Sequence, residues 1–204
     1  MELVKENINE EGIQNAIHTY WVFKNAINKK TCQQIIRFGK NKWTKAEVQN
    51  NLLDGKHLDT NTRKADIVWF DDETVYNMCW NFLLTANRNA NWNFKIDACE
   101  PMQITRYKKN GHYEFHFDGN GFTRFNNPND KLLHGAVRKL SMTIVLNEDY
   151  EGGEFEFFDN NSGLIKEKMG TVIVFPSYMV HRVRPVTKGT RYSLVAWFCG
   201  QPFK

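Results

Sequence analysis

The sequence contains few cysteines, and none of them stands in a pairing motif. Its four cysteines form no C-x-x-C pair; they are Cys32, Cys79, Cys99 and Cys199. This spacing gives no sign of a disulfide framework. We therefore expect free thiols, a reducing compartment and a cytoplasmic location.

Long apolar runs are missing as well. No stretch of about 18 apolar residues occurs, so we predict no membrane span and expect no membrane partner. The first residues, MELVKENINEEG, are polar and acidic and contain no apolar core of a signal peptide, so no secretion signal is predicted. Repeats and low-complexity tracts are also lacking.

A strong excess of one charge is absent too. The 27 basic and 23 acidic residues leave a net charge of +4, which is too small to indicate nucleic-acid binding by itself. Hydrophobic residues make up 41% and aromatic residues 14% of the 204, with 15 phenylalanines. This composition favours a compact, β-rich fold over disorder.

Residues that carry chemistry gather in two segments. The first, YKKNGHYEFHFD, contains His116 and Asp118, which point to the same face of an extended strand while Phe117 faces away. The second, HRVRPVTKGTR, begins at His181 and ends at Arg191. Two histidines and a carboxylate form the ligand set of a 2-His-1-carboxylate iron(II) site. With a fixed cation nearby, they suit a redox enzyme that uses a dicarboxylate cosubstrate.

Each motif also has a simpler interpretation. A single H-x-D or a single histidine is compatible with a surface or packing role, and an arginine in a strand can pair with a carboxylate of the protein. The combination of the two segments is what favours a metal site. Zinc also accepts two histidines and a carboxylate, so the ligands alone do not identify the metal.

These residues resemble a known family, the iron(II)- and 2-oxoglutarate-dependent dioxygenases of the prolyl 4-hydroxylase-like branch. The resemblance spans at least Gln103 to Phe198, and its end is similar to bacterial and phage hydroxylases of the PKHD type. The spacing from Tyr107 to Gly111 is one residue longer than in the commonest pattern. The matching positions are Tyr107, Gly111, Tyr113, His116 and Asp118, the R-x-L-S strand (138–141), the G-G-E strand (152–154) and the segment 181–191.

The resemblance implies a role for each matching residue. His116, Asp118 and His181 would bind Fe(II). Arg191 would pair with the distal carboxylate of 2-oxoglutarate, and Tyr107 would hydrogen-bond to the same cosubstrate. Arginine suits this task because its planar fork of donors matches a carboxylate and keeps its charge. The implied cofactors are Fe(II), 2-oxoglutarate, dioxygen and ascorbate. The implied reaction hydroxylates a C–H bond and releases succinate and CO2.

The hydrophobic pattern predicts a mainly β fold with flanking helices, a double-stranded β-helix (jelly roll, cupin-like) of two facing sheets. We expect one domain over 1–204, with a helix-containing N-terminal part (1–95) and a catalytic core at about 96–204. Helices are expected in 32–40 and 72–89, and a long loop at 40–64. Strands are expected at 20–27, 66–70, 94–96, 102–107, 139–147, 153–158, 171–175 and 191–198, with a ligand strand ending near Asp118 and a polar loop at 119–135.

The substrate is the least determined part. A prolyl residue in a peptide or protein is the leading hypothesis because the resemblance points there, with Tyr113 and Arg138 at the mouth of the site. Both could instead have simple roles, Tyr113 in packing and Arg138 as a solvated charge. The alternatives are a nucleobase oxygenase of the same superfamily, which would need a basic track, and a non-catalytic jelly-roll binding module.

Overall fold

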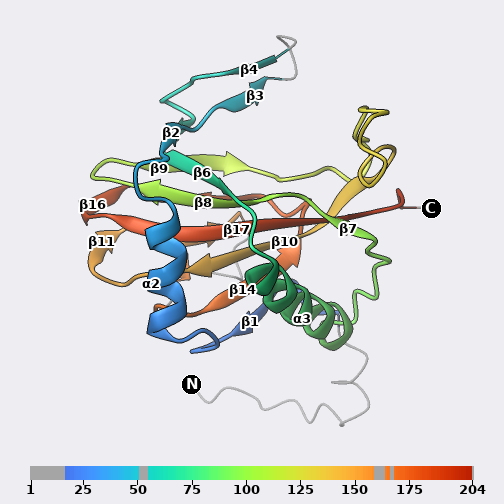
Figure 1. The fold of residues 1–204 in the computed structure, drawn as a ribbon, viewed down its shortest axis with the longest axis horizontal. Coiled ribbons are helices and arrows are strands. Elements are labelled where there is room, and N and C mark those ends of the chain that lie inside the picture. The colour runs from blue at the N-terminus through green and yellow to red at the C-terminus, as the bar shows by residue number, and fades with distance from the viewer. Residues whose placement is uncertain (1–16, 51–54, 159–163, 166–167, 204) are drawn as a thin grey trace, which may run out of the picture.

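The computed structural model describes residues 17–50, 55–158, 164–165 and 168–203, and two antiparallel sheets dominate it (Figure 1). In chain order the elements are β1 (Trp21–Phe23), α2 (Lys29–Phe38), β2 (Thr44–Lys45), β3 (Val48–Asn50), β4 (Gly55–His57), β5 (Arg63–Lys64), β6 (Asp66–Phe70), α3 (Glu73–Asn89), β7 (Ala98–Cys99), β8 (Met102–Tyr107), β9 (His112–His116), β10 (Val137–Val145), β11 (Tyr150–Gly152), β12 (Phe155–Phe157), β13 (Leu164–Ile165), β14 (Val172–Pro176), β15 (His181–Val183), β16 (Val186–Gly189) and β17 (Arg191–Gly200).

The two sheets face each other as in a jelly roll. The major sheet has eight strands in the order β1-β14-β10-β17-β8-β6-β2, with β7 beside β17. The minor sheet has five, in the order β13-β12-β15-β9-β5. Apolar side chains from both sheets meet between them, including Ile67, Phe155, Ile173, Phe175 and Val183. The predicted mainly-β jelly roll is confirmed.

Helices α2 and α3 cover the outer face of the major sheet (Figure 1). Cys32 and Ile35 of α2 are buried, as are Val75, Cys79 and Leu83 of α3. They pack on outward residues of the sheet such as Ile104, Leu140, Met142, Leu194 and Phe198. The major sheet is therefore buried on both faces, which explains the continuous apolar runs in its central strands. No helix among the described residues is long and apolar enough to cross a membrane.

Several element predictions agree closely with the structure. Strands β6 and β8 have the predicted bounds, and β10, β14 and β17 lie within two residues of theirs. Helix α3 begins after Asp72, whose side chain accepts a hydrogen bond from the Val75 backbone N–H at 3.0 Å, a regular N-terminal cap. Helix α2 begins three residues earlier than predicted because Asn28 caps it by accepting from the Thr31 N–H at 2.9 Å.

Three predicted strands need correction. The expected strand 94–96 does not form, because the Asn87 side chain of α3 binds both the N–H and the C=O of Phe94. The first strand is limited to β1, and Asn25, with φ of 52°, ends it. The expected strand 153–158 is shortened to β12, because Gly153, with φ of 68°, is not extended, and the separate strand β11 precedes it.

The predicted loop over 40–64 is also wrong in part. It contains β2, which pairs with β6, and β5, which pairs with β9, as well as the β3–β4 hairpin. These strands have only two or three residues, too few to show an alternating pattern. The N-terminal part thus supplies strands to both sheets as well as both helices. The loop between β9 and β10 has no regular secondary structure, as predicted.

Candidate active site

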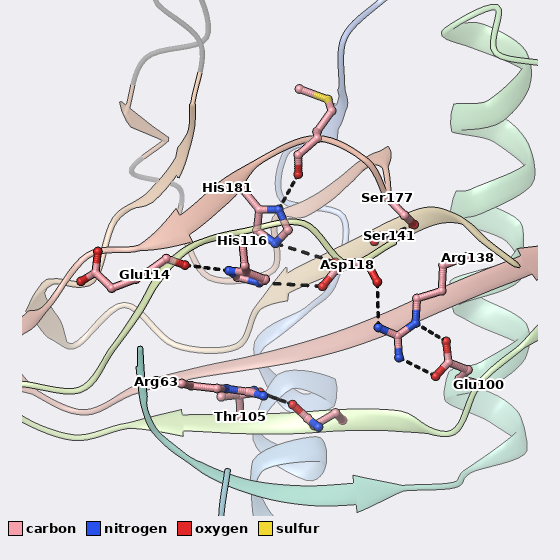
Figure 2. Close-up of polar contacts among 12 residues, drawn as sticks. Arg63, Glu100, Thr105, Glu114, His116, Asp118, Arg138, Ser141, Ser177 and His181 are labelled. Atoms are coloured by element: carbon pink, nitrogen blue, oxygen red, sulfur yellow. Dashed lines mark hydrogen bonds and ion pairs between the residues drawn. The ribbon is translucent and has the colours of Figure 1, made fainter. Parts of the chain in front are cut away.

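Three residues predicted as metal ligands lie together between the two sheets. One nitrogen or oxygen atom from each of His116, Asp118 and His181 lies within 4.8 Å of the others. The His116 Nε2–Asp118 Oδ1 distance is 3.8 Å and the His181 Nε2–Asp118 Oδ2 distance is 3.7 Å (Figure 2). Among the described residues, this is the only group of its kind with three members that could hold one metal ion.

Strand register places these side chains. His116 ends β9 and is the direct partner of His181, the first residue of β15. Asp118 follows the strand end, where its backbone N–H donates to the Ser177 carbonyl at 3.0 Å. Phe117 between the two ligands is 48% exposed, so it faces away, as the i, i+2 spacing predicts.

Both imidazole rings are oriented by the backbone. The Nδ1 atom of His116 lies 2.8 Å from the Glu114 carbonyl oxygen, and that of His181 lies 2.9 Å from the Met179 carbonyl oxygen. A carbonyl can only accept, so each Nδ1 carries the proton and donates. The lone pair of each Nε2 atom is then available at the centre of the group, the arrangement found in metal-binding histidines.

The charge states also suit a metal. Burial, together with the nearby His181, lowers the pKa of His116 to about 3, so that ring is neutral near pH 7. Burial alone would raise the pKa of Asp118, but His181, His116 and Arg138 outweigh it and hold the pKa below its ordinary value. The group therefore offers a neutral imidazole and a carboxylate, which are the protonation states that bind divalent metals.

Arg191 is a buried cation without a carboxylate partner in the described part of the chain. It is 1% exposed at the start of β17, and its Nη1 donates to the Ser193 hydroxyl at 3.0 Å. Its Nε–H has no acceptor. Gly153 allows the close packing here, because a Cβ at that position would lie 3.0 Å from Arg191 Cδ. A buried, unpaired guanidinium is costly unless an anion binds it.

Two cavities lie in this part of the molecule. One of about 40 Å³ is lined by the three candidate ligands and by Tyr107 and Ser193. Another of about 270 Å³ is lined by Arg191, and Phe155 borders both. Tyr107, which is 3% exposed, is the direct cross-strand partner of Arg191. Tyr107 and Arg191 are thus brought to the same end of the site.

The two residues predicted to contact the substrate differ in their placement. Tyr113 lines the smaller cavity and stacks on His116, with ring centroids 3.5 Å apart, and burial raises its pKa to about 12. Arg138 does not line this cavity. Its guanidinium binds the Glu100 carboxylate and the carbonyl of Asp118.

Sequence reasoning missed Arg63, Gln103 and Glu100. Arg63 lies over the Tyr113 ring at 4.6 Å and donates from Nη2 to Gln103 Oε1 at 2.7 Å. Trp197 has a buried indole N–H without an acceptor. Trp197 follows Arg191 by an even number of residues along β17, so alternation places it toward the same interior.

Comparison with known proteins agrees with this geometry. Residues 102–199 match the model of the 2OG-Fe(II) oxygenase superfamily. A protein of Acanthamoeba polyphaga mimivirus, named as a candidate prolyl 4-hydroxylase, is 25% identical over 98% of this chain and 82% of its own length. A PKHD-type hydroxylase of Sphingopyxis alaskensis is 33% identical over 69% of this chain and 64% of its own. The chain spans less than two thirds of the PKHD-type hydroxylases it matches.

A solved structure shares the fold. The viral collagen prolyl hydroxylase of Paramecium bursaria Chlorella virus-1, in complex with 2OG, superposes with a TM-score of 0.65 at 19% identity, covering 90% of this chain and 97% of that one. Family model, relatives and fold thus agree with the resemblance read from the sequence. The comparisons identify the chain as a 2-oxoglutarate-dependent dioxygenase, similar over residues 102–199 to the 2OG-Fe(II) oxygenase superfamily and, within it, to the prolyl 4-hydroxylase-like branch.

Proposed function

We propose that this protein hydroxylates a prolyl residue in a peptide or protein, consuming 2-oxoglutarate and dioxygen and releasing succinate and CO2. In this proposal His116, Asp118 and His181 hold Fe(II). The bound iron and cosubstrate supply the oxidising chemistry that an unactivated C–H bond requires. The protein's own residues position the reactants and exclude water.

The observation that carries the proposal is the unpaired guanidinium of Arg191 beside the His-Asp-His group. Its buried Nε–H needs an acceptor, and the residues around it that the structure describes provide none. The distal carboxylate of 2-oxoglutarate is an anion of the right kind, since an arginine fork binds a carboxylate with two parallel hydrogen bonds. In this proposal the cosubstrate extends from the ligand group, which lines the smaller cavity, toward Arg191, which lines the larger one.

The remaining unpaired groups of the site support a peptide substrate. Arg63 Nε–H and Trp197 Nε1–H are buried without acceptors, and both residues line the smaller cavity. Both groups are donors, so the substrate must offer acceptors. A peptide presents carbonyl oxygens, and a prolyl residue has no backbone N–H that would need an acceptor in return.

The names of related proteins point the same way. The mimivirus relative is named as a candidate prolyl 4-hydroxylase, and the structurally similar viral enzyme is a collagen prolyl hydroxylase. These names describe those proteins, and they motivate the choice of substrate to test on this chain.

The test uses purified protein with Fe(II), ascorbate and 2-oxoglutarate, and measures succinate release. Proline-containing peptides are compared with matched peptides in which alanine replaces each proline, and with oligonucleotides. We expect succinate release coupled to the gain of one oxygen atom on the proline peptides, detected by mass spectrometry. Oxygen gain on oligonucleotides alone would transfer the proposal to a nucleobase oxygenase. No succinate with any substrate, and no 2-oxoglutarate binding, would refute it.

A further inference from the structure

Buried Glu100 and partly buried Arg138 form an ion pair next to the ligand group. Glu100 is 7% exposed and lies in the connection between β7 and β8. Arg138 donates from Nε to Glu100 Oε1 at 2.5 Å and from Nη2 to Oε2 at 2.7 Å (Figure 2). Two parallel hydrogen bonds fix the orientation of the guanidinium as well as its position.

The same guanidinium also binds the backbone of Asp118. Its third nitrogen, Nη1, donates to the Asp118 carbonyl oxygen at 3.0 Å (Figure 2). The turn after Asp118 lies directly on this part of β10, since a Cβ at Gly119 would be 2.8 Å from Arg138 Cβ. The guanidinium carbon lies 4.5 Å from the centroid of the Trp197 ring, which supports it from another side.

These contacts leave Arg138 only partly available to a substrate. All three of its nitrogens are engaged by Glu100 and Asp118, and it does not line the cavity that contains the ligands. Without Glu100, a partly buried cation would remain beside the ligand turn without this ion-pair partner. The nearest compensating charge is then the carboxylate of Asp118, which already feels the charge of Arg138.

We propose that Glu100 is a positioning residue for the metal ligand Asp118, acting through Arg138. This inference rests on the proposed function, because it assumes that Asp118 binds the metal. Glu100 neutralises and orients the guanidinium, so that Arg138 holds the Asp118 carbonyl and leaves the carboxylate free for the metal. Groups that orient metal ligands in this way typically contribute about 10- to 100-fold in metal affinity.

The test measures Mn(II) affinity of the apoprotein by calorimetry, alongside a melting curve. Glu100→Gln should weaken Mn(II) binding by about 10- to 100-fold. The matched control is Asp66→Asn. Asp66 is equally buried and also accepts two hydrogen bonds from an arginine, from Arg106 Nε at 3.1 Å and from Nη2 at 2.8 Å. Neither Asp66 nor Arg106 lines the cavity that contains the ligand group. This control should retain wild-type Mn(II) affinity even where it melts earlier.

Two further variants keep the proposal falsifiable. If Glu100→Gln does not fold, Glu100→Asp replaces it in the test. This variant retains the charge and should lose less Mn(II) affinity than the Gln variant would. Adding Arg138→Gln to Glu100→Gln should cause little further loss, because residues that act through one another are not additive and Glu100 acts through Arg138. Wild-type affinity in the folded Gln variant would overturn the proposal, as would equal losses in the Asp66→Asn control. If the wild-type protein bound no Mn(II), the proposed function would fail with it.

Discussion

Among single side chains, Arg191 allows the sharpest test of the cosubstrate. A hydrogen bond to a charged group is worth about 1.5–3 kcal/mol, which corresponds to roughly a 10- to 150-fold change in affinity. Arg191→Ala should raise the apparent KM for 2-oxoglutarate by about that factor, with metal affinity little changed. Arg191→Lys should recover part of the loss, since it restores the charge but not the fork.

A melting curve separates this role from a structural one. If Arg191 only supported β17, the Ala variant would lose thermal stability and activity together, with no selective effect on 2-oxoglutarate. A stably folded Arg191→Ala protein with the wild-type KM would contradict the cosubstrate role.

The three candidate ligands can be tested against a histidine of the same strand. Replacing His116, Asp118 or His181 with Ala should remove Fe(II) binding and abolish turnover, because a three-ligand site has none to spare. His112 is the control, since both of its ring nitrogens already lie within 3.1 Å of backbone carbonyls of Asn110 and Asn61. His112→Ala should bind metal normally. Full succinate production by any ligand variant would remove that residue from the site.

How much of the site was predictable depends on the residue. Spacing predicted that His116, Asp118 and His181 form one group, and the structure brings them together, because the chemistry needs those residue types whatever surrounds them. It could not identify Glu100, because nothing local marks a carboxylate whose partner is 38 residues away. It also assigned Arg138 to the substrate, whereas the structure shows its guanidinium held by Glu100 and the Asp118 carbonyl.

At the level of elements, the outer face of the minor sheet contains an acid-sensitive contact. Glu156 of β12 accepts hydrogen bonds from Arg184 and Arg182, which lower its pKa from the ordinary 4.5 to about 2. The stabilisation is complete above the ordinary pKa and is lost as the pH falls from about 4.5 to about 2. We expect Glu156→Gln to cost no more than about 1 kcal/mol at pH 7, because solvent screens ion pairs at the surface.

Melting curves of wild type and Glu156→Gln at several pH values check this. The difference in Tm should shrink as the pH is lowered below 4.5. A difference that stayed constant down to pH 2 would show that the loss at neutral pH comes from packing, because packing does not titrate.

The segment after α3 shows why one predicted strand did not form. Asn87 replaces the hydrogen bonds that a neighbouring strand would have given Phe94. Asn87→Ala leaves both groups unpaired, which should cost about 1–3 kcal/mol, or on the order of 5 °C in Tm for a chain of this size. Asn89→Ala, an exposed asparagine of the same helix, should melt like the wild type. Equal Tm values for both variants would contradict this role of Asn87.

Elements differed in how far the sequence determined them. Long central strands such as β8 and β14 were predicted well, since burial on both faces leaves a continuous apolar run. Strands β2 and β5 were missed because edge strands of two residues are set by their partners β6 and β9. The N-terminus of α2 was misplaced because it depends on one cap, Asn28.

For the molecule as a whole, ligand binding should raise stability by mass action. A ligand at 100 times its Kd adds about 2.7 kcal/mol when it binds only the folded state. For a chain of 204 residues this corresponds to an increase of about 5–11 °C in Tm. We expect Mn(II) with 2-oxoglutarate to give such an increase and a chelator to reverse it. An unchanged Tm at saturating concentrations would contradict ligand binding to the folded protein.

The pairing of β9 with β15 has a consequence for how this molecule can change. Because His116 and His181 are direct cross-strand partners, and Asp118 and Gly119 both donate to the Ser177 carbonyl, the ligand group is held by backbone contacts that end at Gly119. The segment from 120 to 135 then leaves the sheets and returns at β10. Insertions, deletions or a transplanted loop in that segment should leave the three candidate metal ligands in place while changing which substrates reach them. A one-residue insertion within β9, by contrast, would turn His116 away from the interior.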